Sequence, residues 1–218
     1  MKEPVRLLVF DLDGTLIDSK ADLAGSVNHA LVAFGLPALA PSRIYSYIGD
    51  GATMLIRRAA GEDGNGLFPA VLDRFLSHYR RHLLDTTFPY PGVLENLRKW
   101  ADSYSMAVLT NKPLDMTRAI LSGLALDRFF PDVIGGDSFG SKKPDPEGLL
   151  HLMKSRGASP GETLMVGDSR NDVLAGKGAG ARTCGVTYGL GAGGFSENPP
   201  DFTVGEFSEI FERIRPVR

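Results

Sequence analysis

Short apolar runs that give way at once to polar residues limit the fold of this chain more than any other feature. Residues 5–10, 107–109 and 163–166 are runs of this kind, and 132–136 is a shorter one. Between them apolar residues recur with helical spacing, as they do from 113 to 124. Strands that alternate with helices of this length are joined by right-handed crossovers and make a parallel sheet covered on both faces. The sequence therefore predicts an α/β fold with a doubly wound parallel sheet.

A helical segment interrupts this alternation between the first two strands. After Gly14 one apolar stripe comprises Leu23, Val27, Ala30, Leu31 and Phe34. Helical spacing then continues, with a long amphipathic helix expected from 68 to 83. We expect residues 16–87 to form an α-helical cap inserted into a core made of residues 1–15 and 88–218. The two connecting segments are candidate hinges.

The last third of the chain completes the predicted sheet. Residues 182–186 are expected to form the last core strand, 202–204 a short edge strand and 206–213 a closing helix. Residues 189–200 are rich in Gly and Pro, which favours a loop.

Composition excludes several classes of protein. The 218 residues are long for one average domain and short for two, which fits a core with an inserted module. A formal net charge of −2 with scattered Lys and Arg gives no electrostatic footprint for nucleic acid. No apolar stretch approaches the ~18 residues of a membrane span, and the single Cys184 makes a reducing compartment the default. We therefore expect a soluble cytoplasmic protein, a monomer or homodimer, without nucleic-acid or membrane partners.

Two carboxylates come directly after the first apolar run. Asp11 and Asp13 are alternate residues of an extended chain, so their side chains face the same side. The carboxyl ends of strands in an open α/β sheet line the crevice where ligands bind. Two crowded acids raise each other's pKa, so a divalent cation is their natural partner. The structural alternative is a plain strand end followed by a turn at Gly14.

Polar residues also follow the later strands. Thr110 and Asn111 follow one run, Lys143 comes after the short strand, and Asp168 and Asp172 follow the third run. A hydroxyl, backbone N–H groups, a lysine and carboxylates suit the binding of a metal-bound phosphate. Each segment also has a structural alternative. Thr110 and Asn111 could cap a helix, Lys143 could lie on the surface, and the two acids could stabilise a helix N-terminus.

In their order along the chain, these strand ends resemble the four motifs of the haloacid dehalogenase superfamily of aspartyl-phosphate enzymes. The matching segments are 11–16, 110–111, 143–144 and 167–169, with Asp172 as a second acid after the last. The resemblance covers nearly the whole chain and implies a Rossmann-like core with a helical cap. Within the superfamily, five shorter segments resemble phosphoglycolate phosphatases: 18–19, 21–23, 35–37, 48–51 and 57–59.

The resemblance implies a role for each acid. Asp11 is expected to be the nucleophile that forms an aspartyl phosphate. Asp13 is expected to protonate the leaving group and then to activate water. A Mg²⁺ ion is expected at the carboxylate of Asp11, the backbone carbonyl of Asp13 and Asp168, with Asp172 holding waters of the metal.

The resemblance also implies how the substrate is bound. Thr110, the N–H of Asn111 and Lys143 are expected to bind the phosphoryl oxygens. A small carboxylated substrate needs a cation near its far end, and Arg58 in the cap is the candidate. Arg58 shares a helix face with Met54, however, so its stem could instead cover the apolar side of the cap.

Three functions stay open. The first is a phosphatase of small phosphorylated acids, with 2-phosphoglycolate as the expected substrate. The second is another branch of the superfamily: a sugar-phosphate or pyrophosphate hydrolase, or a phosphosugar mutase. The third is a non-enzymatic protein that reuses the fold. The intact motifs argue against the third function, and the sequence at 51–53, where mutases carry a phosphate-binding arginine nearby, weakens the mutase reading.

Overall fold

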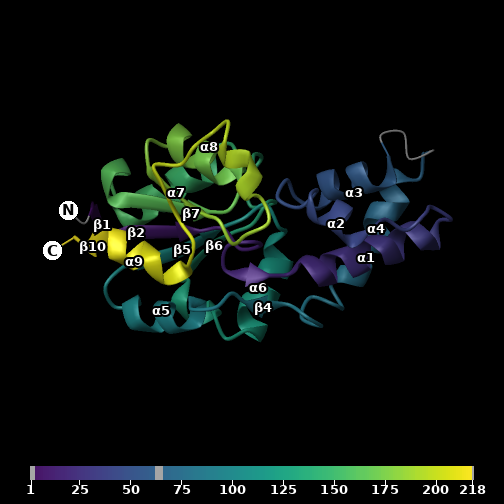
Figure 1. Cartoon of the computed structure of the whole chain (residues 1–218), viewed down its shortest axis with the longest axis horizontal. Helices are drawn as coiled ribbons and strands as arrows, with labels where there is room; N and C mark the ends of the chain where they lie inside the picture. The colour runs from purple at the N-terminus through teal and green to yellow at the C-terminus, as the bar shows by residue number, and fades with distance from the viewer. Residues whose placement is uncertain (1–2, 62–65, 218) are drawn as a thin grey trace.

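The computed structural model describes residues 3–61 and 66–217, which form a sheet-containing core with a helical lobe beside it (Figure 1). Within these residues one sheet contains six strands: β2 (Leu7–Phe10), β5 (Ser105–Leu109), β6 (Asp132–Ile134), β7 (Thr163–Gly167), β8 (Arg182–Val186) and β9 (Phe202–Val204). Their spatial order is β6-β5-β2-β7-β8-β9, and every neighbouring pair is parallel. The predicted parallel sheet is confirmed.

Helices cover both faces of the sheet. They are α5 (Val93–Trp100), α6 (Leu114–Gly123), α7 (Glu147–Arg156), α8 (Arg170–Gly178) and α9 (Ile210–Arg213). Figure 1 shows α7 and α8 above the sheet and α5 and α9 below it. In β2, Leu8 and Phe10 pack in one apolar cluster while Leu7 and Val9 pack in the other, which explains the continuous apolar run. Among the described residues no helix is long and apolar enough to cross a membrane.

The register of the sheet places the carboxyl ends of neighbouring strands side by side. Phe10 of β2 lies opposite Val108 of β5 on one side and Val166 of β7 on the other. The N–H of Asp11 still donates to the carbonyl of Val166 at 2.9 Å. Asp11 and the residues that follow β5 and β7 therefore leave the sheet at the same edge.

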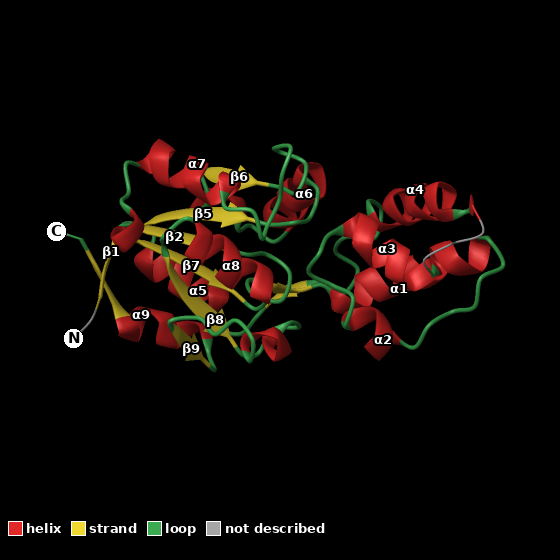
Figure 2. Cartoon of the chain, turned by 90° about the horizontal axis from the view of Figure 1, so that it is seen from above, coloured by secondary structure: helices red, strands yellow, loops and turns green. Residues whose placement is uncertain are grey.

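The helical lobe lies between two short strands. It contains α1 (Lys20–Ala33), α2 (Pro41–Tyr45), α3 (Ala52–Ala60) and α4 (Phe68–Tyr79). Strand β3 (Ile17–Asp18) enters the lobe, β4 (Phe88–Pro89) leaves it, and the two are antiparallel. Figure 2 shows the lobe set apart from the sheet at this pair of strands. These helices lie within the expected cap, residues 16–87, and the division into two domains stays a proposal.

Three boundaries differ from the sequence-based expectation. The first run is divided at Arg6 into β1 (Glu3–Val5) and β2, because β1 pairs with β10 (Ile214–Pro216), a strand that the sequence did not indicate. The closing helix is a 3-10 turn at Phe207–Glu209 followed by the short α9. Helix α4 ends at Tyr79, before the expected residue 83, and the chain continues in turns.

Asp22 holds the end of those turns against α1. Its carboxylate accepts hydrogen bonds from the N–H and hydroxyl groups of both Thr86 and Thr87, at 2.6 to 3.0 Å. Burial raises the pKa of Asp22, but these hydrogen bonds outweigh burial and hold the pKa below its ordinary value. The carboxylate thus joins the start of the lobe to the segment that leaves it.

Replacing Asp22 by Ala should lower the free energy of unfolding by about 3 kcal/mol at pH 7, because four donors lose a charged acceptor. The folded-state pKa is depressed, so this contribution is present above the unfolded-state value of about 4. It is lost as the pH falls through the folded-state value. Denaturant unfolding of wild type and variant at pH 7 and pH 3 measures both effects.

Asp73→Ala is the matched control for this experiment, since Asp73 is exposed on α4. Its free energy of unfolding should stay within about 0.5 kcal/mol of wild type. Equal stability of Asp22→Ala and Asp73→Ala at pH 7 would contradict the account of Asp22.

Candidate active site

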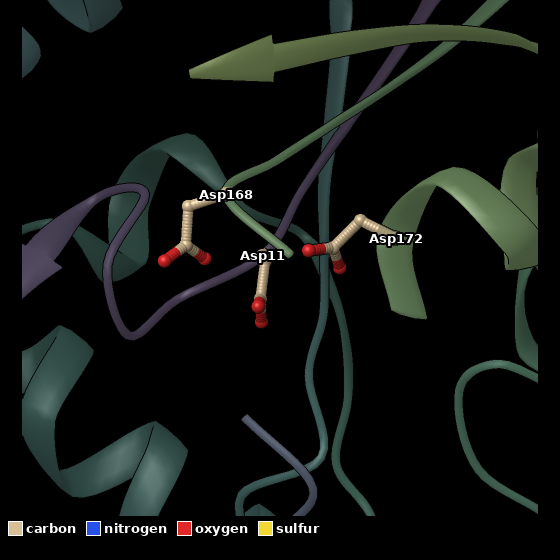
Figure 3. Close-up of side chains that lie close together, drawn as sticks. All are labelled: Asp11, Asp168 and Asp172. Atoms are coloured by element: carbon tan, nitrogen blue, oxygen red, sulfur yellow. The ribbon is translucent and has the colours of Figure 1, made fainter. Parts of the chain in front are cut away.

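Three buried carboxylates form a cluster at the carboxyl edge of the sheet. Asp11 follows β2, Asp168 follows β7 and Asp172 lies in the first turn of α8. Each offers an oxygen atom within 4.8 Å of the others. Figure 3 shows Asp11 between Asp168 and Asp172, with the three carboxylates turned toward a common space. An all-oxygen donor set of this kind fits a hard divalent cation.

Burial and crowding work against three negative charges here. Burial raises the pKa of Asp168 to about 8, and the nearby charges of Asp11 and Asp172 add to this. Burial likewise raises the pKa of Asp11 to about 6, although Lys143 opposes it. A cation among the carboxylates would relieve this cost. The raised pKa values of these two carboxyl groups are therefore a second reason, besides the oxygen donor atoms, to place a metal there.

Backbone packing fixes the position of Asp168. Its Oδ2 atom accepts the N–H groups of Leu190 and Gly191 at 2.7 and 2.9 Å. A Cβ at Gly14 would lie 2.2 Å from this oxygen, and one at Gly189 would lie 2.3 Å from the Cβ of Asp168. Both loops therefore need glycine at these positions. The segment after β8, which the sequence indicated only as a loop, supports the cluster.

Lys143 inserts a positive charge between two of the acids. Its Nζ atom lies 2.9 Å from Oδ1 of Asp11 and 2.6 Å from Oδ1 of Asp172, and its side chain is only 2% exposed. The alternative of a surface lysine is wrong. Asp172 also accepts hydrogen bonds from the N–H and hydroxyl of Ser169, which closes a capping box on α8. Asp172 therefore does both: it stabilises the N-terminus of α8, as the structural alternative proposed, and it is part of the carboxylate cluster.

Asp13 faces the helical lobe and is outside the carboxylate cluster described above. Its Oδ1 atom accepts hydrogen bonds from the hydroxyl of Ser19 and from Nζ of Lys112, the latter at 2.7 Å. The same Nζ donates to the hydroxyl of Tyr79 on α4, also at 2.7 Å. Burial alone would lower the pKa of Lys112, but Asp13 and Tyr79 raise it above its ordinary value, so this lysine is charged. Core and lobe are joined here through one ammonium group.

Thr110 and Asn111 line the space between core and lobe. The amide Nδ2 of Asn111 donates to the carbonyl oxygens of Lys143 and Gly49, at 2.9 and 3.0 Å. It therefore links the third predicted motif to the lobe. The N-cap alternative for these residues is wrong, since α6 begins only at Leu114, after Pro113.

The pocket between core and lobe is small. Its volume is about 40 Å³. The core contributes Asp11, Asp13, Thr110, Asn111, Lys112, Pro113 and Met116, and the lobe contributes Leu23, Ile48, Gly49, Gly51, Ala52, Leu55, Phe75 and Tyr79. Apolar side chains thus cover much of the lobe side, and the polar groups come mainly from the sheet edge. The enclosure suits a small ligand whose polar groups face the core.

Arg58 lies outside the lining of this pocket. Its Nη2 atom is 2.5 Å from Oδ2 of Asp50, and Nη1 donates to the carbonyl of Tyr47 at 3.4 Å. Oδ1 of Asp50 accepts a 2.6 Å hydrogen bond from Asn171, and its carbonyl accepts one from Lys142. Arg58 thus supports the turn that docks the lobe on the core. Its expected role in reading a substrate carboxylate stays a prediction.

Four contacts at this site were not predicted: those of Ser19, Tyr79, Lys112 and Asn171. Lys112 and Asn171 each stand beside a predicted residue in the sequence, and that adjacency was the available signal. Ser19 and Tyr79 reach the site through the packing of the lobe, for which the sequence carried no signal.

Comparison with known proteins identifies several relatives. The family model described as haloacid dehalogenase-like hydrolase matches residues 8–186. "Phosphoglycolate phosphatase 1" of Pseudomonas aeruginosa is 42% identical over 215 residues, which are 94% of this chain and 78% of that protein. A phosphoglycolate phosphatase of Vibrio parahaemolyticus is 38% identical over 224 residues, 98% of this chain and 97% of that protein.

A solved structure has the same fold. It is the crystal structure of a predicted phosphoglycolate phosphatase from Haemophilus somnus, with a TM-score of 0.90 and 33% sequence identity. The similarity covers 95% of this chain and 97% of that one. The structural similarity therefore includes both the core and the helical lobe.

The raised pKa of Asp168 predicts how metal and pH act on stability. Without metal, the folded protein keeps this proton up to about pH 8, whereas the unfolded carboxyl loses it above the ordinary value of 3.8. The folded state binds more protons in that window, so stability falls as the pH rises. A divalent cation bound at the cluster would take the place of the proton, so the gain in Tm on adding Mg²⁺ should be larger at pH 8 than at pH 6.

Thermal unfolding at pH 6, 7 and 8, in EDTA and in Mg²⁺, measures this gain. Asp168→Asn should remove it, whereas Asp102→Asn, at an exposed position, should keep it. A gain that is equal at all three pH values, or that persists in Asp168→Asn, would contradict metal binding at the cluster.

Proposed function

The chain belongs to the haloacid dehalogenase-like hydrolase family, and on that premise we propose that it hydrolyses 2-phosphoglycolate to glycolate and phosphate. It is a phosphoric monoester hydrolase with a small substrate. The single observation that carries the proposal is the pairing of Asp11 with Lys143 inside a buried carboxylate cluster at a small pocket between core and lobe. The names of the relatives support the choice of substrate.

In this proposal Asp11 is the nucleophile. One oxygen of its carboxylate attacks phosphorus in line, the bond to the ester oxygen breaks, and an aspartyl phosphate forms. Oδ1 of Asp11 is oriented by the N–H of Leu12 at 2.7 Å and by Lys143 at 2.9 Å. Water then attacks phosphorus, which releases phosphate and restores the carboxylate.

Asp13 is the proposed proton carrier. It gives a proton to the leaving oxygen of glycolate and takes one from the attacking water in the second step. Ser19 and Lys112 hold its carboxylate at the boundary between core and lobe. Thr110, the N–H of Asn111 and Lys143 are the proposed ligands of the phosphoryl oxygens.

A divalent cation, Mg²⁺ in our proposal, would be held by the carboxylates of Asp11 and Asp168 and the backbone carbonyl of Asp13, with Asp172 acting through water. When bound, it neutralises negative charge on the phosphoryl group. Asp168 is already fixed for this task by two backbone N–H groups.

The closed pocket also bears on the alternatives. Its small volume and apolar lobe side leave few partners for the hydroxyl groups of a sugar, which favours a small acid over a sugar phosphate. A pyrophosphate hydrolase and a mutase keep the same chemistry at Asp11 and stay the alternatives. Cytoplasmic location and a monomeric or homodimeric state stay predictions.

Asp11→Asn should reduce kcat to less than about 1% of wild type, because an amide neither attacks phosphorus nor supplies charge to a metal. Steady-state hydrolysis of 2-phosphoglycolate with Mg²⁺ measures the loss, and circular dichroism checks the fold. Asp102→Asn, at the surface, should keep wild-type activity. Substantial turnover by Asp11→Asn would reject the nucleophile.

Removal of metal should abolish activity, since the carboxylates of the cluster then lack their counter-charge. Activity should vanish in EDTA and return with Mg²⁺, while Ca²⁺ restores it poorly because its looser coordination disturbs in-line attack. Full activity in EDTA would rule out the metal.

In a substrate panel under Mg²⁺, 2-phosphoglycolate should give a higher kcat/KM than sugar phosphates, pyrophosphate or p-nitrophenyl phosphate. A sugar phosphate with the highest kcat/KM of the panel would rule out the proposed substrate.

A further inference from the structure

Lys112 is a buried cation to which the proposed chemistry gives only the task of holding Asp13. Its side chain is 4% exposed, and the residue comes directly after the segment that follows β5 and is proposed to bind phosphate. Its Nζ atom lies 4.8 Å from the centre of the Tyr79 ring and donates to the hydroxyl of that residue. An ammonium group has three N–H donors, and Asp13 and Tyr79 take two of them. The third is available to a ligand in the pocket that Lys112 lines.

Lys112 is also the basic side chain of that pocket. Among the described residues that line it, the other charged groups are the carboxylates of Asp11 and Asp13. The second cation considered for a substrate carboxylate, Arg58, is outside the lining and paired with Asp50. A negatively charged group that enters beyond the phosphate therefore finds its partner at Lys112.

The position of Lys112 sets a length for such a ligand. The ester oxygen must come within about 2.6–3.2 Å of an oxygen of Asp13 to receive its proton. Nζ of Lys112 is 2.7 Å from Oδ1 of Asp13. Oδ1 already accepts hydrogen bonds from Ser19 and Lys112, so Oδ2 is the proton donor, and the ester oxygen lies within about 8 Å of the ammonium group. A carboxylate one carbon away from the ester oxygen can reach the ammonium group within that limit, without the extra rotatable bond that a longer acid must order.

We propose that Lys112 binds the carboxylate of the substrate and so restricts the enzyme to short phosphorylated acids. The inference rests on the proposed hydrolysis at Asp11, and it adds the residue that selects the substrate class. The lobe takes part through Tyr79, which orients the ammonium group only when α4 is packed over the pocket. Leu55, Phe75 and Met116 enclose the pair of charges and keep water from weakening their attraction.

The test compares a phosphate ester whose organic group carries a carboxylate with one whose organic group is uncharged and similar in size. Isobutyl phosphate has two methyl groups where 2-phosphoglycolate has its two carboxylate oxygens. The measured quantity is the carboxylate preference, the ratio of kcat/KM for 2-phosphoglycolate to kcat/KM for isobutyl phosphate. Lys112→Met keeps an unbranched side chain, one atom shorter and without the charge, and should lower this ratio about 100-fold, the size of a buried charged hydrogen bond.

Two control variants keep the inference specific. Lys154→Met removes an exposed lysine on α7, and Arg58→Ala removes the alternative cation. Both should leave the ratio within about threefold of wild type, whatever they do to activity as a whole. Equal losses on both esters in Lys112→Met would overturn the proposal, since a residue that only positions Asp13 affects both. Collapse of the ratio in Arg58→Ala instead would assign the carboxylate to Arg58.

A third ester separates this inference from the choice of 2-phosphoglycolate. If wild type prefers 2-phospholactate and Lys112→Met removes that preference, the proposed substrate is wrong and the role of Lys112 stands. If wild type hydrolyses isobutyl phosphate as well as either acid, the role of Lys112 is wrong and the phosphatase stands. Failure to hydrolyse any of the three esters would reject both.

A measurement on wild type covers the case in which Lys112→Met does not fold. Lengthening the acid from 2-phosphoglycolate to 3-phosphooxypropanoate places the carboxylate one carbon further from the ester oxygen. We expect kcat/KM to fall by at least about tenfold for this methylene, because the charged hydrogen bond is lost. Equal rates for the two acids would overturn the inference.

Discussion

The burial of like charges at one edge of the sheet governs the rest of this structure. Asp11, Asp168 and Asp172 bring three carboxylates together with little exposure to water. Coulomb repulsion and lost hydration make this arrangement costly unless positive charge lies among them. Lys143 supplies one such charge, and the raised pKa values of Asp11 and Asp168 indicate that it is insufficient. A divalent cation bound among the carboxylates would supply the missing positive charge.

Polar contacts join the lobe to this edge, and two groups of them lie at the site. At one, Asn111 and Asn171 donate to the turn at Gly49 and Asp50, which Arg58 supports from behind. At the other, Lys112 joins Asp13 to Tyr79. Each contact uses a residue of the core that stands beside a proposed catalytic or phosphate-binding residue. Closure of the lobe and assembly of the catalytic groups are therefore parts of one event in our account.

The sequence predicted the sheet and the strand-end residues because both depend on local pattern. Continuous apolar runs mark strands that are buried on two faces, and polar residues at their ends share one edge once the strands are parallel. The division at Arg6 was not predictable, because it depends on β10 from the other end of the chain. Apolar spacing continues to Leu83 and so does not report the end of α4 at Tyr79. Arg58 and Lys112 illustrate the same limit for the site, since the direction of a long side chain is set by its partners in the folded protein.

The central claim is that phosphate passes through a covalent bond to Asp11. It is tested most directly by quenching the enzyme with acid during turnover of 2-phosphoglycolate, reducing it with borohydride and locating the modified residue by peptide mass spectrometry. An aspartyl phosphate is reduced to homoserine, so the account predicts homoserine at position 11, formed only when substrate and Mg²⁺ are present. An unmodified Asp11 in enzyme that is turning over, or homoserine at another acidic residue, would contradict it.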